Sequence, residues 1–181
     1  MDKKLEPQKF NPTTPKKNNP SCAKPFEIYF DGSFSPQDKS AGIGVVVTKN
    51  GEKVSSMARG IPGKASHLAE INAMVAALDE AVKIKSADPS AFIRIFGDSS
   101  SVISTFLKRL SNISRSGYGV IGAIADETSA LYDRAALTFC GLGSSVRIGW
   151  VPRSYNQMAD RCSKKGRHRQ TKKILAQAHA A

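Results

Sequence analysis

The sequence has little that would build a disulfide framework, a zinc site or a membrane span. Its three cysteines, Cys22, Cys140 and Cys162, are scattered and form no C-x-x-C pair, so free thiols are expected. The longest apolar runs, such as GIGVVV, are far shorter than the roughly 18 to 20 residues that cross a bilayer. The first residues, MDKKLEPQKF, lack the apolar centre of a secretion signal. We therefore expect a soluble, cytoplasmic protein with no membrane partner.

Acidic residues are also missing from one part of the chain. The formal net charge is +12. Residues 1–24 carry six lysines against two acids, and residues 161–181 carry seven lysines and arginines against none, whereas residues 25–160 are almost neutral. Basic segments attract polyanions through their long-range field and through counterion release, which favours nucleic acid as the partner class. The alternative is that the lysine-rich segments only confer solubility.

The composition divides the chain into three parts. Residues 1–25 hold five prolines and few apolar residues, which predicts a disordered basic arm. A single folded domain is predicted for residues 26–165, with a length typical of one core. Gly166 is a candidate break in the last helix, and residues 166–181 are predicted to form a basic C-terminal tail. No internal repeat is found, and a monomer is expected.

The apolar pattern predicts an α/β fold with five strands and four helices. The predicted strands are FEIYFD (26–31), IGVVVTK (43–49), VSSMARG (54–60), AFIRIFG (91–97) and SSVRIGWVP (144–152). The predicted helices cover residues 66–85, 99–110, 117–137 and the segment from 156 onward. The first helix is the clearest, because five apolar residues recur on one face: Leu68, Ile71, Val75, Leu78 and Val82. Helical crossovers imply a mixed sheet, with the first three strands in an antiparallel meander and strands one, four and five parallel.

Two of the predicted strands stop at an aspartate. IYFDGS places Asp31 after the first strand, and IRIFGDSS places Asp98 after the fourth. If these strands are parallel neighbours, both carboxylates stand at the edge of the sheet where α/β proteins bind ligands. Glu70, beside the buried face of the long helix, and Asp160, near the start of the last helix, are placed to reach the same edge.

Four carboxylates at close range repel each other and need a compensating charge. Oxygen ligands without Cys or His suit Mg²⁺ or Mn²⁺ rather than zinc, and two such ions about 4 Å apart promote phosphodiester cleavage. Each acid also has an ordinary explanation. Asp31 could be a turn residue, Asp98 a helix cap and Glu70 a solvated acid, and Asp160 could pair with Lys164 one turn later.

The order of elements and acids resembles type 1 ribonuclease H, in the branch with AGxG and WVPRxxNxxAD motifs. Here the motifs read AGIG (41–44), HLAEINAMVAAL (67–78), FGDSS (96–100) and WVPRSYNQMAD (150–160). The likeness spans about residues 26–165. It implies a ribonuclease H-like fold and a metal-dependent endonuclease that hydrolyses the RNA strand of RNA·DNA hybrids and leaves 3′-hydroxyl and 5′-phosphate ends.

The resemblance also implies roles for individual residues. Asp31, Glu70, Asp98 and Asp160 would be catalytic and would ligate two Mg²⁺ ions, with Mn²⁺ as an alternative and Asp31 as the bridging ligand. RNA would be recognised through its 2′-hydroxyls. The expected substrate contacts are backbone at Gly32 and Ser33, the loop residues Arg153 and Asn156, and the basic residues Lys164, Lys165 and Arg167.

The sequence departs from the family pattern at three places. The loop VPRSYNQM has no histidine, and FSPQDKS replaces the glycine- and proline-rich segment after the first Asp. The basic protrusion of some members is missing from LKRLSNISRSGYG. The basic C-terminus is a candidate substitute for that protrusion. One alternative function is a catalytically weak nucleic-acid-binding module of a larger assembly. An exonuclease or transposase of the same superfamily fits less well, because Ser33 stands where the former typically has an acid and Asp160 where the latter has Glu.

Overall fold

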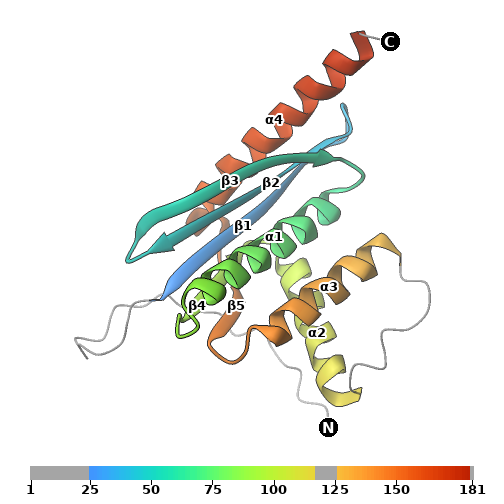
Figure 1. The fold of residues 1–181 in the computed structure, drawn as a ribbon. Coiled ribbons are helices and arrows are strands. Elements are labelled where there is room, and N and C mark those ends of the chain that lie inside the picture. The colour runs from blue at the N-terminus through green and yellow to red at the C-terminus, as the bar shows by residue number, and fades with distance from the viewer. Residues whose placement is uncertain (1–24, 117–125, 180–181) are drawn as a thin grey trace.

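The computed structural model describes residues 25–116 and 126–179, which form a five-stranded sheet between helices (Figure 1). The strands are β1 (Phe26–Ser35), β2 (Ser40–Lys49), β3 (Glu52–Pro62), β4 (Ile93–Gly97) and β5 (Val146–Trp150). The helices are α1 (Ser66–Ala87), α2 (Ser100–Ser116), α3 (Glu127–Gly141) and α4 (Gln157–His179), and a 3₁₀ turn, η2 (Arg153–Tyr155), precedes α4. The strand order is β3-β2-β1-β4-β5, with β1 to β3 antiparallel and β1, β4 and β5 parallel. The predicted mixed sheet is confirmed.

β1 does not stop at its aspartate as predicted. Its parallel pairing with β4 ends at Phe30, opposite Gly97, but its antiparallel pairing with β2 continues to Ser35. The strand persists because β2 alone satisfies its backbone groups beyond this point. Asp31 therefore lies where β1 separates from β4.

α1 supplies most of the core on one face of the sheet. Ile71 and Leu78 are fully buried, as the predicted face requires, and alanines between them are buried as well. The extra burial arises because α3 packs against α1 on the side away from the sheet. Val82 departs from the prediction and is 40% exposed, because Ala81 takes the buried position at that turn.

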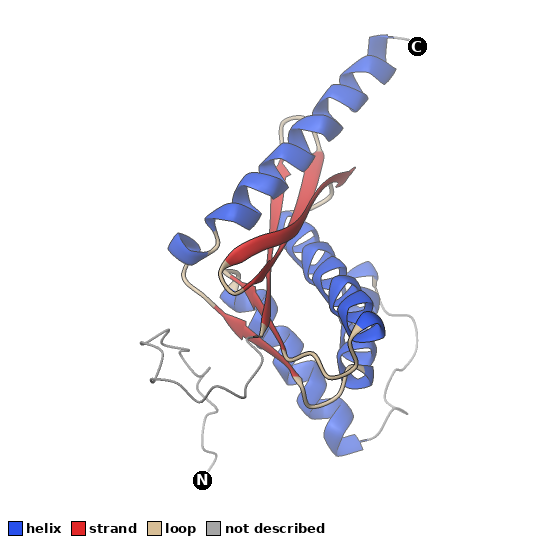
Figure 2. Ribbon diagram, turned by 60° about the vertical axis from the view of Figure 1, so that its left-hand side comes forward, coloured by secondary structure: helices blue, strands red, loops and turns tan. Residues whose placement is uncertain are grey.

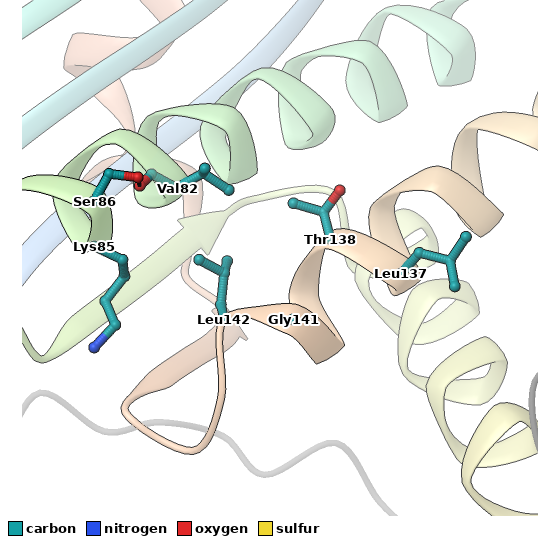
Figure 3. Close-up of a pocket in the computed structure, with 7 residues that line it drawn as sticks. All are labelled: Val82, Lys85, Ser86, Leu137, Thr138, Gly141 and Leu142. Carbon is teal, nitrogen blue, oxygen red and sulfur yellow. Dashed lines mark hydrogen bonds between the residues drawn. The ribbon is translucent and has the colours of Figure 1, made fainter. Parts of the chain in front are cut away.

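Val82 lines a shallow surface pocket of about 360 Å³ between α1 and the C-terminal end of α3 (Figure 3). Leu137 and Leu142 line the same pocket from the α3 side. No acidic residue is among its lining residues, so this pocket is separate from the predicted carboxylate site.

α4 covers the opposite face of the sheet and runs past the ends of the strands (Figure 2). It continues through Gly166, so the predicted break there was wrong, and residues 166–179 are part of the helix. Gly166 is buried, and a Cβ on it would lie 2.5 Å from the carbonyl oxygen of Arg59. A glycine at this position lets α4 pack closely against β3.

The glycines of the AGIG motif serve the same contact from the sheet. A Cβ on Gly44 would lie 2.3 Å from the carbonyl oxygen of Ala159, and one on Gly42 would lie 2.1 Å from the backbone nitrogen of Arg167. Side chains at these positions would push α4 off β2. The motif therefore seats the last helix directly on the sheet.

Some predictions concern residues that the structure does not describe. Apart from Pro25, the predicted arm lies outside the described residues, as do residues 117–125 of the predicted third helix. The described part of that helix, α3, begins at Glu127, and α2 runs to Ser116 rather than to Leu110. Within residues 25–116 and 126–179, no helix is both long and apolar enough to cross a membrane.

Candidate active site

Three carboxylates meet where β1 separates from β4. Asp31 lies within β1, Asp98 directly follows β4, and Glu70 lies in the second turn of α1. Each contributes an oxygen, and these oxygens lie within 4.8 Å of one another. Asp31 is buried, whereas Glu70 and Asp98 are half-buried. Three elements that are distant in sequence thus build one acidic cluster.

Gly32 determines how closely Glu70 approaches the strand. Its backbone N–H donates a hydrogen bond to the Glu70 carboxylate at 3.1 Å. A Cβ on Gly32 would lie 2.3 Å from the backbone carbon of Ala69, so any side chain would displace α1. The Gly32 amide is therefore bonded to Glu70 in this structure, and the backbone contact of Gly32 with a substrate stays a prediction.

Asp98 is held by two residues from the segment at the end of β5 and after η2. The indole nitrogen of Trp150 donates to its backbone carbonyl at 2.9 Å. The Asn156 side-chain amide donates to its carboxylate at 3.2 Å and to the carbonyl of Phe30 at 2.8 Å. Asn156 has no exposed surface, so it cannot make the phosphate contact predicted for it. The turn η2 directs this side chain inward, where it links β1 and the end of β4 at the point where the two strands separate.

Asp31 is held from the opposite face of the sheet by Ser163 of α4. The buried Ser163 hydroxyl donates to the Asp31 carboxylate and also lies 2.9 Å from the carbonyl oxygen of Asp160. Because it has a single proton, the charged acceptor is favoured. Sequence reasoning missed Ser163. The signal that would have found it is the row of small residues Ala159, Ser163 and Gly166 on one face of the last helix.

Asp160 does not join the other three acids. Its carboxylate pairs with the Arg153 guanidinium and, at 2.7 Å, with the Lys164 ammonium. Burial alone would raise its pKa, but the hydrogen bonds from Lys164 and Arg153 together lower it. Asp160 is still close enough to Asp31 for its charge to raise the pKa of that carboxyl. The predicted pairing with Lys164 is present, and three of the four predicted acids are brought together.

The cluster is short of positive charge. Burial, with added repulsion from Asp31 and Asp98, raises the pKa of Glu70 to about 8. Burial, with repulsion from Asp98 and Asp160, also raises the pKa of Asp31 to about 6, although the Ser163 hydrogen bond opposes this. A divalent cation would stabilise both carboxylates in their ionised form. The donor set is all oxygen, which fits Mg²⁺ or Mn²⁺.

Three further predicted contact residues are Ser33, Lys165 and Arg167. Ser33 is half-buried on β1, opposite Gly42. Lys165 is exposed on α4. Arg167 is partly buried, and its Nε has no hydrogen-bond partner among the described residues. Their contacts with a substrate stay predictions.

A mixed sheet in the order β3-β2-β1-β4-β5, with helices on both faces and acids where β1 and β4 separate, defines a ribonuclease H-like protein. The match to a family is direct. The chain belongs to the RNase H family, whose model matches residues 23–168. No curated protein matches the chain significantly.

Solved structures show the same fold at low sequence identity. The N-terminal RNase H domain of Rv2228c from Mycobacterium tuberculosis is 23% identical, with a TM-score of 0.59 over 86% of this chain and 99% of that one. LC11-RNase H1, isolated from compost by a metagenomic approach, is 19% identical, with a TM-score of 0.65 over 81% of this chain and 97% of that one. The same protein has been solved in complex with an RNA/DNA hybrid, and this structure matches with a TM-score of 0.62.

A viral enzyme shows the fold as part of a longer chain. The foamy viral protease-reverse transcriptase in complex with an RNA/DNA hybrid is 21% identical, with a TM-score of 0.64. The match covers 91% of this chain but 23% of the viral one. The fold described here therefore corresponds to one part of that enzyme.

Proposed function

We propose that this protein is a metal-dependent endonuclease that hydrolyses the RNA strand of RNA·DNA hybrids. The observation that carries the proposal is the cluster of Asp31, Glu70 and Asp98 in a chain of the RNase H family. LC11-RNase H1 and the foamy viral enzyme, both solved with such hybrids, support the same substrate class.

In this proposal the three clustered carboxylates hold the metal. Bound Mg²⁺ supplies a Lewis acid that stabilises charge on a phosphodiester and lowers the pKa of water. The protein's own contribution is to fix the ligands in place. Ser163 orients Asp31, and Asn156 orients Asp98. The Gly32 amide orients Glu70 in the same way. Such supporting contacts determine how well ligands match the geometry of the metal.

Asp160 is proposed as the fourth ligand. Its ion pairs must be released before it can bind the metal. Its two oxygens now face Arg153 and Lys164. Both cations lie on the exposed side of the site, where phosphate oxygens are alternative acceptors for their charge-assisted hydrogen bonds. When phosphate oxygens of the substrate bind Arg153 and Lys164, the Asp160 carboxylate is released and turns toward Asp31. Ser33, beside the cluster on β1, is proposed to contact a 2′-hydroxyl of the RNA strand.

A second candidate function is a catalytically weak binding module. It is favoured by the same ion pairs, because they hold Asp160 away from the other acids in this structure. In this case the fold would bind a hybrid as one unit of a larger assembly, with little hydrolysis.

Cleavage of a labelled RNA·DNA hybrid in Mg²⁺ tests the proposal and separates the two candidates. Duplex DNA, duplex RNA and single strands are assayed alongside it. We expect cleavage of the RNA in the hybrid and a loss of more than about 100-fold in Asp98→Asn, since even supporting residues of metal sites contribute about 10- to 100-fold. Asp79→Asn changes an acid of α1 that pairs with Arg134 of α3; it is the matched control and should retain full activity.

The other outcomes are equally informative. Cleavage of every substrate alike would contradict hybrid specificity. An inactive wild type that still binds the hybrid would favour the binding module. Full activity in Asp98→Asn would exclude the carboxylate cluster as the catalytic centre.

A further inference from the structure

The solvent side of α4 is basic without interruption. Every exposed residue between positions 161 and 173 is a lysine, an arginine or a histidine. We call this surface the basic face, and it consists of Arg161, Lys164, Lys165, His168, Arg169, Lys172 and Lys173. The intervening residues are buried or partly buried, so no exposed acid interrupts the charge.

The basic face is continuous along the helix from Arg161, the residue after Asp160, to Lys173. Arg161, Lys165, His168 and Lys172 recur at intervals of three or four residues, which places them in one row. At 1.5 Å per residue, this row is about 16 Å long. Its first member follows Asp160 directly, and Ser163, on the opposite side of the same turns, contacts Asp31.

The basic face has a fixed backbone and, in the part of the chain that the structure describes, several side chains that lack ion-pair partners. α4 is fixed to the sheet by its close approach to β2 and β3, and by a 2.6 Å hydrogen bond from the Thr171 hydroxyl to Asp38. Within the described residues, Arg161, Lys165 and Lys172 form no ion pair or side-chain hydrogen bond, whereas Lys164 pairs with Asp160. The row is therefore rigid in its backbone and uncompensated in its charge.

We propose that the basic face binds the phosphate backbone of the RNA·DNA hybrid next to the cleaved bond. This inference rests on the proposed function for the identity of the duplex. A duplex carries about one phosphate charge per 1.7 Å of its axis, so a length of about 16 Å presents roughly ten negative charges to the row. The row starts one residue after Asp160, and in this proposal the duplex continues beyond the cleavage site onto the outer side of α4.

A lipid surface fits this helix less well. Helices that lie in a membrane interface insert an apolar face into it, with basic residues at its border. The large apolar side chains that α4 exposes are Met158 and Leu175, one at each end of the basic face and none within it. The small residues Ala159, Ser163 and Gly166 are buried against the sheet.

Binding without metal tests this inference independently of catalysis. The affinity of the full chain for a fluorescent RNA·DNA hybrid is measured in EDTA over a range of salt concentrations. The test variant is Arg161→Gln/Lys165→Gln/Lys172→Gln. The control variant, Lys53→Gln/Lys108→Gln/Arg147→Gln, removes the same charge from exposed positions on β3, α2 and β5. Circular dichroism and thermal unfolding establish that both variants are folded.

We expect the test variant to lose about tenfold or more in affinity near 100 mM salt. Its slope of log affinity against log salt should fall by about three, one for each lost phosphate contact, while the control keeps a nearly wild-type slope. In Mg²⁺, the KM of the test variant should rise while kcat stays unchanged, as expected when contacts bind the substrate and the transition state equally.

Three results would overturn the inference: no binding by the wild type, equal losses in the two variants, or an unchanged slope in the test variant. If the test variant no longer binds anionic phosphatidylserine vesicles but still binds the hybrid, the basic face binds lipid instead. The failures are distinguishable. If the wild type cleaves hybrids and the test variant binds them normally, only this inference is refuted. If the test variant alone loses binding but the wild type does not cleave, only the proposed function is refuted.

Discussion

The two faces of the sheet are covered in different ways. On one face, α1 buries Ile71, Met74 and Leu78 together with alanines, and α3 covers α1 in turn. On the other face, α4 buries only Ala159, Ser163 and Gly166. The first contact depends on apolar volume. The second depends on backbones that approach closely, because glycines on β2 and α4 leave room for them.

This difference separates stability from function. The α1 face supplies the hydrophobic stabilisation, which scales with the apolar area removed from water. The α4 face needs little apolar surface, so its helix is free to carry a basic outer side and to place Ser163 and Asp160 beside the acidic cluster. Substitutions on the two faces, and the pH dependence of stability, test this division.

Leu78→Ala should destabilise the protein strongly. Leu78 is fully buried on the α1 face, and the cavity left by its removal should cost about 2–5 kcal/mol of unfolding free energy. Urea unfolding measures this cost. Leu175→Ala on α4, where the side chain is 51% exposed, is the matched control and should stay within about 0.5 kcal/mol of the wild type. Equal costs would contradict the division between the faces.

Gly44→Ala should cost less stability but should also reduce activity. The new methyl group would collide with the backbone of α4, and such overpacking costs about 1–3 kcal/mol. Because the displaced helix carries Ser163, hybrid cleavage should fall as well. Gly149→Ala is the control, since a Cβ there meets nothing within 4 Å. A Gly44→Ala variant with normal stability and activity would show that the close approach is unimportant.

The stability of the metal-free protein should decline as the pH rises from about 5 to 8. Burial and the neighbouring carboxylates raise the pKa of Glu70 from 4.5 to about 8 in the folded state. In this window the folded protein holds a proton that the unfolded chain has released, so the unfolding free energy falls with pH. Glu70→Gln should flatten the decline in EDTA, as should saturating Mg²⁺ in the wild type. Glu52→Gln, on exposed β3, should leave it unchanged.

Ser163→Ala should have the smallest effect on stability and a clear effect on the site. The lost hydrogen bond should cost about 0.5–1.5 kcal/mol. Because Asp31 loses the contact that orients it, Mg²⁺ affinity measured by calorimetry should fall by about 10-fold or more. Ser104→Ala is the matched control, since that helical serine bonds the carbonyl three residues earlier and contacts no carboxylate. Equal metal affinity in both variants would remove Ser163 from the account.

Residue patterns are sufficient to predict the sheet and most of the acidic cluster. The apolar strands before Asp31 and Asp98, and the helical spacing around Glu70, are local signals that survive in the fold. The pairing of Asp160 with Lys164 is equally local, since the two lie one helical turn apart.

The remaining features depend on contacts between distant segments. The continuation of β1 past Asp31 requires β2 as its partner, and the inward direction of Asn156 follows from the preceding turn. Gly166 predicts a helix break because glycine has low helix propensity. In the structure, packing of α4 against β3 outweighs this low propensity. Arg153 pairs with Asp160 from the turn η2 directly before α4, a contact that no sequence motif marks.

The central claim is that Asp31, Glu70 and Asp98 form a divalent-metal site. Anomalous diffraction at the manganese edge, from crystals of the wild-type protein grown with Mn²⁺, tests it most directly. We expect anomalous density in contact with carboxylate oxygens of all three residues, and its loss in Asp98→Asn. Manganese bound elsewhere, with none between these carboxylates, would contradict it.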